Sequence, residues 1–500
     1  MDKQSLYIPQ RQSPKAILLI LYKYLLIIIR QIWPVLIIFL INPTSGKARY
    51  ITLIVLAVVF FALIYSLLAY RRFYYFIQQN ELCVRSGVFR RTVINVPFDR
   101  IQSVDFKRNI THQLLNVVSV EIDTAGSKKS ELELDAIEID KAEALRDIVL
   151  AYKHAKSVAT EESSGPTPPL PQTFEQPELL LSLSPTDLMK VGISENHIRT
   201  AGIIFAFFLG LADDLDQLLG WDVYGELEHT TTAMSLVGIL ATIIAIPIFI
   251  FVSFVITMIR TVLRYYGLKF WREGKRFKVV SGLLTRQEKT IQQSKVQVIR
   301  WMTSPLKRVF GIYQMNIYQA ANFDQHEDRS LSIPGCYQLQ VDETLDVVVP
   351  GFRSAKFATH LMHPRIVIVM VFILGFIPAV LFGLMAWYNR GVMQWLLILV
   401  FPLAILMGYL YQRKRRFKIH PDFILSEGGI FGNNFKLIET YKIQRVNITS
   451  SPMQRARGLS SLHIYTAGGD VTFPYLHHTI AVQARDYILY RVEKENKPWM

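Results

Sequence analysis

Six runs of apolar residues, grouped in pairs, restrict the fold of this chain more than any other feature of its sequence. Four of the six contain no Asp, Glu, Lys or Arg. A bilayer core about 30 Å thick is crossed by roughly 20 apolar helical residues, so each run is a candidate membrane span. The sequence predicts three helical hairpins with six spans, at Ala16–Ile41, Tyr50–Tyr70, Ile198–Ala212, Met234–Ile259, Ile366–Tyr388 and Val392–Tyr411.

The composition agrees with a membrane protein. Apolar residues make up 51% of the chain and charged residues only 19%, against roughly 25% charged in an average soluble protein. The only two cysteines, Cys83 and Cys336, exclude a disulfide scaffold and a four-thiolate zinc site. The net charge of +15 indicates contact with an anionic partner, either nucleic acid or phospholipid.

Cations are concentrated at the outer ends of the three hairpins. The hairpin tips carry few cations, and the middle tip is acidic. The positive-inside rule therefore places both termini and the three polar regions in the cytoplasm. The outer cations are Lys3, Arg11, Lys15, Arg71, Arg72, Lys190, Arg199, Arg260, Arg264, Lys356, Arg365, Arg413, Lys414, Arg415 and Arg416.

The three polar regions are copies of one another. Each contains a glycine followed by two apolar residues, at Gly87, Gly282 and Gly429. A basic–aliphatic–glutamine triplet follows each glycine, with its glutamine fifteen residues after the glycine. A strand-like stretch begins eighteen residues after each glutamine. Agreement of both spacings in three copies indicates an internal triplication. The triplets are Arg100–Ile101–Gln102, Lys295–Val296–Gln297 and Lys442–Ile443–Gln444.

Each copy alternates apolar and polar residues with the period of a β-strand, as in 92–96. The first and third copies end in a helical pattern with one apolar stripe, over 141–154 and from 484 onward. Such a helix covers its own sheet. The second copy shows no clear closing helix, and its fold is less certain from sequence. Residues 163–185 are proline-rich and predict a linker, with docking to a proline-reading domain as the alternative.

The predicted organisation follows from these boundaries. The chain is a polytopic α-helical membrane protein with three cytoplasmic β domains. The predicted parts are hairpin 1 at 16–70, domain 1 at 71–157, the linker at 158–190, hairpin 2 at 191–262, domain 2 at 263–355, hairpin 3 at 361–411 and domain 3 at 412–500.

These features resemble a known family. A membrane hairpin, a basic juxtamembrane patch, and a β unit with the glycine and the (Arg/Lys)-(Ile/Val)-Gln triplet are similar to the bacterial pleckstrin-homology (PH)-like domain. Three copies resemble the three-repeat YdbT-type members of the YdbS/YdbT-type family. The resemblance implies PH-like β-barrel or sandwich domains capped by a helix, at the bacterial cytoplasmic membrane. It also implies a link to envelope stress or antimicrobial-peptide resistance, and a smaller single-domain YdbS-type partner.

No catalytic motif is present in the sequence. A Walker loop, a Gly-x-Ser-x-Gly elbow, a His-Glu-x-x-His helix and a Cys-x-x-Cys pair are all missing. His360 and His363 have the spacing of metal ligands, but no thiol or carboxylate is near them in sequence, so juxtamembrane packing is favoured over a metal site. We therefore predict no enzyme, no metal site and no cofactor.

Basic residues are the candidate interaction sites. The juxtamembrane cations face the headgroups of an anionic leaflet, where each contributes about 1 kcal/mol. The triplets are either structural or in contact with a headgroup or peptide. Arg30 lies within an apolar run, and is either interfacial or a functional intramembrane charge. The predicted lipid or partner residues are Arg71, Arg72, Arg413, Lys414, Arg415, Arg416, Arg100, Gln102, Lys295, Gln297, Lys442 and Gln444.

The sequence thus predicts a non-enzymatic membrane scaffold of the cell envelope. Its expected partners are anionic phospholipid and either a YdbS-type protein or a second copy of itself. Nucleic acid is disfavoured because the cations adjoin membrane ends instead of forming one basic face. The alternative is an exporter or channel for amphipathic peptides, which requires polar residues along several spans; only Arg30, Ser253 and Thr257 qualify.

The charge pattern generates a test of topology. Epitope tags inserted near residues 120, 320 and 465 are expected to be protected in intact cells and labelled only after the membrane is permeabilised. Labelling of any one of them from outside the cell contradicts the predicted orientation.

Overall fold

The computed structural model describes residues 6–41, 46–124, 132–161, 177–219, 236–319, 330–388 and 393–494. The chain divides into two compact units. The first comprises residues 1–173, 195–268 and 280–289, and the second comprises 174–194, 269–279 and 290–500.

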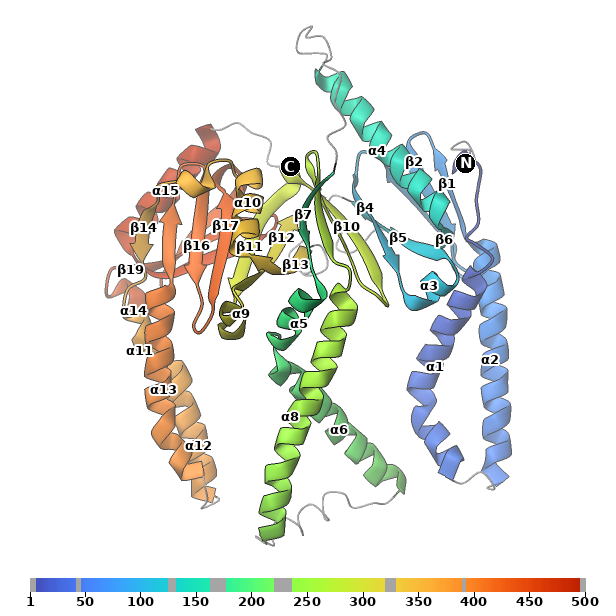
Figure 1. Cartoon of the computed structure of the whole chain (residues 1–500), viewed down its shortest axis with the longest axis horizontal. Coiled ribbons are helices and arrows are strands. Elements are labelled where there is room, and N and C mark those ends of the chain that lie inside the picture. Colours follow the sequence, from blue (N-terminus) through green and yellow to red (C-terminus); the bar gives the residue numbers. More distant parts are fainter. Residues whose placement is uncertain are drawn as a thin grey trace. The chain divides into compact units, whose positions relative to one another are not determined.

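The described residues of all six apolar runs are helical, and consecutive helices pack as hairpins (Figure 1). Among the described residues, two helical stretches are long and apolar enough to cross a membrane, Leu53–Arg72 and Pro247–Tyr265. Three shorter apolar helical stretches lie at Ala16–Ile28, His197–Phe207 and Ile366–Leu381. The helices are α1 (Ala16–Ile41) with α2 (Gly46–Arg72), α6 (His197–Leu219) with α8 (Leu236–Tyr265), and α11 (Ile366–Val371) and α12 (Ile377–Tyr388) with α13 (Met393–Lys414).

Small residues hold the third hairpin together. A Cβ atom added to Gly375 would lie 3.2 Å from Cβ of Ala404, and one added to Gly408 would lie 3.2 Å from the Cβ of Met370. Small residues at such positions let two helix backbones approach closely, which is how helices associate where no hydrophobic effect drives them together. A π-helical turn, Phe372–Phe376, joins α11 to α12.

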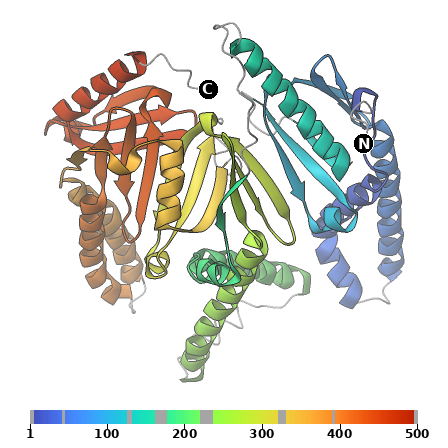
Figure 2. The ribbon, with the colours of Figure 1, turned by 45° about the horizontal axis from the view of Figure 1, so that its top comes forward.

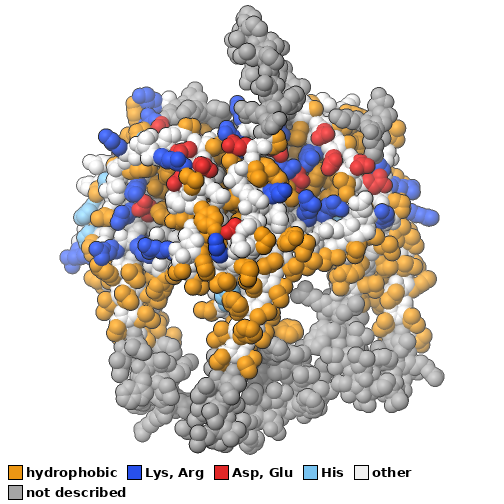
Figure 3. Space-filling model, in the orientation of Figure 1, with side chains coloured by type: hydrophobic (Ala, Val, Ile, Leu, Met, Phe, Trp, Pro, Cys, Tyr) orange, Lys and Arg blue, Asp and Glu red, His pale blue; other side chains and the backbone are white. Residues whose placement is uncertain are grey.

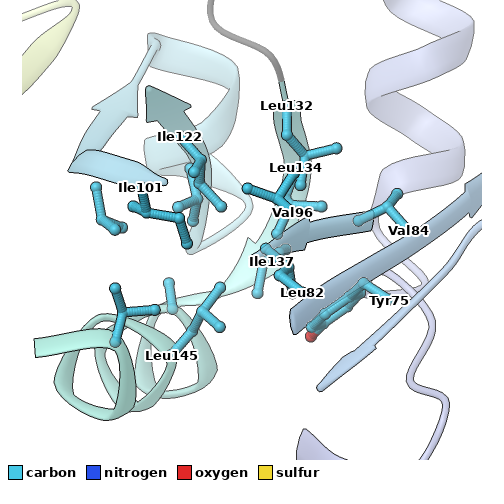
Figure 4. Packing of buried hydrophobic residues seen from close by; sticks show 14 of the residues in the cluster. Tyr75, Leu82, Val84, Val96, Ile101, Ile122, Leu132, Leu134, Ile137 and Leu145 are labelled. Atoms are coloured by element: carbon cyan, nitrogen blue, oxygen red, sulfur yellow. The ribbon is translucent and has the colours of Figure 1, made fainter. Parts of the chain in front are cut away.

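Domain 1 is a two-sheet sandwich closed by a helix. Leu82, Ile122 and Leu145 come from the two sheets and the helix, and each is at most 1% exposed in the common core (Figure 4). Burying one such side chain contributes about 1.5–3 kcal/mol. The elements are β1 (Tyr74–Gln78), β2 (Glu81–Ser86), β3 (Thr92–Pro97), β4 (Ile101–Arg108), α3 (Ile110–Leu114), β5 (Val117–Thr124), β6 (Leu132–Glu138) and α4 (Ile139–Glu161).

The other two domains repeat this plan. Domain 2 consists of β7 (Glu178–Ser182), α5 (Pro185–Ile193), β8 (Lys269–Glu273), β9 (Arg276–Ser281), β10 (Arg286–Gln292), β11 (Val296–Thr303), α9 (Pro305–Val309), β12 (Ile312–Gln319), β13 (Ser330–Tyr337) and α10 (Gln338–Val348). Domain 3 consists of β14 (Ala358–Leu361), β15 (Arg416–Ile419), β16 (Phe423–Gly428), β17 (Asn433–Glu439), β18 (Ile443–Thr449), α14 (Pro452–Arg455), β19 (Leu459–Thr466), β20 (Gly469–His477) and α15 (His478–Lys494).

The closing helices of domains 1 and 3 are confirmed, and domain 2 has one as well. Val341, Leu345 and Val348 are buried on one face of α10, at the spacing of an amphipathic helix. This helix has only 11 residues, so its pattern was too short to recognise in the sequence. The predicted linker over 158–190 also contains structure, because β7 and α5 lie within it; 162–176 falls outside the described residues.

Each hairpin is inserted between two neighbouring strands. β7 precedes the second hairpin and pairs with β8, which follows it; β14 and β15 flank the third hairpin in the same way. Before the first hairpin, Gln10 forms an isolated bridge with Tyr75 of β1. Both ends of each hairpin are therefore fixed to one sheet.

The sheets continue from one domain into the next (Figure 2). The first strand of the second sheet in one domain pairs with the last strand of the first sheet in the following domain. We call the antiparallel pairing of β4 with β10 the first join, and that of β11 with β17 the second join. The resulting seven-stranded sheets have the orders β6-β5-β4-β10-β9-β8-β7 and β13-β12-β11-β17-β16-β15-β14.

Side chains strengthen both joins. In the first, Nη1 of Arg146 on α4 lies 2.6 Å from Oε1 of Glu288 on β10, and its guanidinium lies over the ring of Phe106. In the second, the rings of Trp301 and Phe435 stack with centroids 5.1 Å apart. Aromatic pairs across strands, such as Trp301 with Phe435, contribute roughly 0.2–1 kcal/mol.

The repeated glycine fits a left-handed turn. Gly87 and Gly282 both have φ of +105°, and Gly429 has φ of +120°. A Cβ added to Gly429 would lie 2.3 Å from the carbonyl oxygen of Gly432, which no side chain tolerates.

We expect Gly429→Ala to lower the melting temperature of the purified protein. The substitution forces an alanine into a left-handed conformation and a backbone clash, which costs more than about 1 kcal/mol. Gly202→Ala on α6 is the control, because a Cβ there meets nothing within 4 Å. Equal melting temperatures for the two variants would contradict the turn assignment.

Candidate functional site

The junction between each hairpin and its β domain is the candidate interaction site. A single residue, Phe73, separates α2 from β1. A single residue, Arg415, likewise separates α13 from β15. Figure 3 shows hydrophobic side chains over the described parts of the hairpin helices and many of the Lys and Arg side chains over the neighbouring β domains. Basic residues at such a boundary reach the level of lipid headgroups.

Two of the predicted cations turn inward and hold the domain to its helix. Nη1 of Arg72 donates to the carbonyl oxygen of Val88 at 2.6 Å. Nζ of Lys414 donates to the carbonyl oxygens of Phe431 and Gly432 at 2.9 and 3.1 Å. Arg72 and Lys414 occupy the same position in repeats 1 and 3 and bind the same turn. They therefore fix the turn that contains the repeated glycine.

The remaining juxtamembrane cations divide into one inward and three outward side chains. Arg415 donates to the carbonyl oxygen of Thr472 at 2.5 Å and also bonds the hydroxyl of Tyr411. Arg71, Arg413 and Arg416 are exposed. In the run 413–416 the two middle cations are therefore bonded to the protein, and the two outer ones are exposed.

The triplet of repeat 3 lies inside the second join. Lys442 is 1% exposed, and its Nζ donates to the carbonyl oxygen of Val296 at 2.6 Å and to Oε1 of Glu439 at 2.7 Å. Gln297 is 2% exposed, and a Cβ on Gly468 would lie 2.5 Å from its own Cβ. Both residues therefore connect domain 2 to domain 3.

The other triplet members have different surroundings. Arg100 and Gln444 are exposed. Lys295 is partly exposed, and burial lowers the pKa of its ammonium. The side chains of Gln102 and Arg30 lie outside the described residues. The structure thus brings the triplets of repeats 2 and 3 together through the bond from Lys442 to Val296, and among the described members Arg100 and Gln444 are left exposed.

A pocket in domain 3 was not predicted from sequence. It has a volume of about 370 Å³ and lies between β14, the end of β15 and α15. The sequence pattern does not indicate this pocket, because its walls are far apart in the chain: β14 precedes the third hairpin, and α15 follows the last strand of domain 3. Its lining includes Lys356, His360, His420, Gln483, Ala484 and Tyr487.

The histidine and cysteine side chains that could carry metal or thiol chemistry pack against other parts of the fold. The ring of His363 lies 5.4 Å from that of His477, and burial, His477 and Arg365 lower the pKa of His363. Within the described residues, no three His, Cys, Asp or Glu side chains form a metal-binding group. Burial raises the pKa of Cys336 to about 12, so its thiol stays protonated. Burial also raises the pKa of Cys83, with Glu81 adding to the shift.

The two hydroxyl groups considered for a polar pathway are on α8 and buried. Ser253 is 0% and Thr257 6% exposed, and Oγ1 of Thr257 donates to the carbonyl oxygen of Ser253 at 2.7 Å. This bond within one helix satisfies the Thr257 hydroxyl.

Comparisons with known proteins agree with the repeated architecture. The family model described as "Bacterial PH domain" matches the chain three times, at residues 18–153, 207–342 and 344–492. A curated relative, the "UPF0699 transmembrane protein YdbT" of Bacillus subtilis (strain 168), is 23% identical over 474 residues. The alignment covers 89% of this chain and 90% of the relative.

Removing the buried ammonium of repeat 3 is expected to weaken the second join. Lys442→Met removes two hydrogen bonds of a charged group and leaves Glu439 without its cation, at a cost of about 1.5–3 kcal/mol. Arg100→Met, at the same position of repeat 1, is the control and is expected to change stability by less than about 0.5 kcal/mol because Arg100 is exposed. Thermal unfolding of the two purified variants measures the difference; equal losses contradict the assignment.

Proposed function

The chain belongs to the bacterial PH domain family, with three copies of the domain, and from this premise we propose that it is a non-enzymatic membrane scaffold of the cell envelope. In this proposal the three hairpins cross the cytoplasmic membrane six times. The PH-like domains lie on the cytoplasmic side, where they contact anionic lipid and protein partners. The relative in Bacillus subtilis is named a transmembrane protein, which supports the membrane location.

The observation that carries the proposal is the exposure of apolar helices attached to well-packed β domains. In the apolar windows of Leu53–Arg72 and Pro247–Tyr265, only 11% and 17% of residues are buried inside the protein. Exposed apolar surface of this extent marks contact with a membrane or another protein. Lipid is the favoured contact because the helices are long enough to cross a bilayer core.

The inserted hairpins support an even number of crossings. β14 and β15 pair directly, with Ala358 opposite Ile419, although the whole third hairpin lies between them. Two strands in one ladder lie on one side of a membrane, so the intervening chain crosses twice or not at all. The same argument applies to β7 with β8 and to Gln10 with Tyr75. Together with the cations at the outer ends, it favours cytoplasmic domains.

Three exposed cations carry the proposed lipid contact. Arg71, Arg413 and Arg416 are exposed at the junctions between helix and domain, whereas Arg72, Lys414 and Arg415 are bonded to protein carbonyls. Electrostatic attraction to anionic headgroups contributes about 1 kcal/mol per cation near the surface. The inward cations then keep the domain close enough to the bilayer for the outward ones to act.

The lipid contact can be tested in the reconstituted full-length protein. Spin-labelled phosphatidylglycerol and phosphatidylcholine report the preference of the protein surface for anionic lipid. We expect the triple variant Arg71→Gln, Arg413→Gln, Arg416→Gln to lower this preference, by about five-fold per cation at low salt if each is worth about 1 kcal/mol. Raising the ionic strength should reduce the preference of the unmodified protein in the same direction.

A matched control is Arg100→Gln with Arg445→Gln and Arg485→Gln, which removes two exposed cations and the partly exposed Arg485, all away from the ends of the hairpin helices. This variant should retain the lipid preference. If both triple variants lose it equally, the effect is one of net charge and the proposed contact is wrong. Unchanged preference in the first variant also rejects it.

A further inference from the structure

Domains 1 and 3 each keep one sheet edge that their counterparts use in a join. β3 is the terminal strand of the sheet β1-β2-β3, and β18 is the terminal strand of the sheet β18-β19-β20. β3 corresponds to β10 and β17, and β18 corresponds to β4 and β11. We propose that β18 of one copy of this chain pairs with β3 of a second copy, and that the contact repeats the internal joins. The inference rests on the proposed scaffold and names its partner.

The two internal joins have the same register, which defines the register of the proposed one. In the first join Arg108 pairs with Arg286, and in the second Thr303 pairs with Asn433. Arg108 and Thr303 stand at one repeat position, as do Arg286 and Asn433. The same rule, applied once more, places Ser450 opposite Arg91 of the second copy. It follows that Thr449 faces Thr92, Ile448 faces Val93, Asn447 faces Ile94 and Val446 faces Asn95.

Over residues 92–95 of β3 and 446–449 of β18 neither edge carries a charge, a proline or a bulge; Pro97 ends β3, and the bulge of β18 lies between Ile443 and Arg445. Exposed edge strands are normally blunted by charged residues, prolines or bulges. Residues 92–96 of β3 read Thr-Val-Ile-Asn-Val and contain no charge and no proline. In β18 the single charged residue is Arg445. Both strands are rich in β-branched residues, which favour pairing over solvation.

A strand paired with β3 would cover the side chain of Val93. This side chain is 59% exposed, although it is a β-branched residue within a strand. At the same repeat position, Phe435 stacks on Trp301 across the second join, and Glu288 bonds Arg146 across the first. Ile448 stands at the position of Trp301 and packs against the core of domain 3. The proposed join therefore places the two apolar side chains Ile448 and Val93 on one face.

Arg100 offers a second contact. Its counterpart Lys442 crosses the second join and donates to the carbonyl oxygen of Val296, the first residue of β11. Arg100 is exposed in domain 1. In the proposed join its guanidinium reaches the carbonyl oxygen of Ile443, the first residue of β18. The same repeat position thus carries a buried cation that bonds across the second join in repeat 3 and an exposed cation in repeat 1.

One position differs without opposing the join. Val298 of β11 is buried in the core of domain 3, whereas its counterpart Arg445 is exposed and lies 4.2 Å from the centre of the Tyr465 ring. The first join has Ser103 at this position. Because the two internal joins already accept a serine and a valine there, the pairing does not depend on an apolar residue.

The proposed contact joins different surfaces on the two copies. Such a head-to-tail contact is heterologous, and it continues until the chain of copies closes as a ring or extends as a filament. The protein in membranes is therefore expected as an oligomer of more than one size or as a closed ring, with all copies related by the same join.

Cysteine cross-linking of the full-length protein tests the register. Two differently tagged forms, one with Val93→Cys and one with Ile448→Cys, are co-expressed and the membranes are mildly oxidised. Directly opposed residues of antiparallel strands have Cα atoms about 4.5–5.5 Å apart, within disulfide range. We expect a disulfide-linked dimer containing both tags. Buried Cys83 and Cys336 remain in both forms, and each single variant expressed alone shows their background.

The register control pairs Val93→Cys with Asn447→Cys. A shift of one residue points the side chain to the other face of the sheet, so the dimer is expected to be lost. A double variant with Val93→Cys and Ile448→Cys in one chain detects closure within a single molecule. A cross-linked monomer without any mixed-tag dimer overturns the inference, as does the absence of every cross-link.

An edge-blocking variant gives a second readout. Val93→Lys should convert the purified oligomer into single chains by light scattering in detergent, whereas Val93→Thr should not. Neither variant should change the melting temperature of domain 1, because Val93 is exposed. Retained anionic-lipid preference with no cross-link rejects this inference alone, and the reverse result rejects only the lipid contact. An oligomer that survives Val93→Lys overturns the join.

Discussion

The antiparallel pairing of strands from consecutive domains holds the described architecture together. In the second join β11 pairs with β17 over six residue pairs, from Val298 with Ile438 to Thr303 with Asn433. Backbone hydrogen bonds are nearly independent of side-chain type, so three domains of divergent sequence can keep one way of joining. Side chains then adapt to each site, as an ion pair in the first join and a ring stack in the second.

A second constraint ties the β domains to the hairpins. The cation that ends the second helix bonds the carbonyls of the glycine turn, through Arg72 in repeat 1 and Lys414 in repeat 3. In repeat 2 the turn meets the helix end directly, as Leu283 donates its amide to the carbonyl of Leu263. Charged and uncharged contacts therefore fix the same geometry. Several of these cations are thus bonded within the protein, and their number alone overstates the charge that would be available to headgroups in the proposed lipid contact.

Local pattern predicted most of the elements but not their pairing. The apolar runs, the alternation over 92–96 and the repeated glycine at Gly429 gave the helices, strands and turns, because each depends on nearby residues. The joins depend on which sheet edge of one domain pairs with which edge of the next. Because the three copies have similar edge strands, the sequence does not indicate which edges pair. The burial of Lys442 was hidden for the same reason: its triplet matches that of exposed Arg100, and only the neighbouring domain separates the two. The six-span arrangement and the lipid contact stay predictions.

The strand that precedes each hairpin has a consequence for how the protein is made. β14 finds its partner β15 only after the ribosome has released the whole third hairpin, and β7 waits in the same way for β8. The sheet is therefore completed only after the hairpin has been synthesised. Until then the edge of each partly built sheet is open. In the proposed topology, this order places a folding step after the synthesis of the second and third hairpins, and a hairpin delayed in entering the membrane would leave its β domain unfinished.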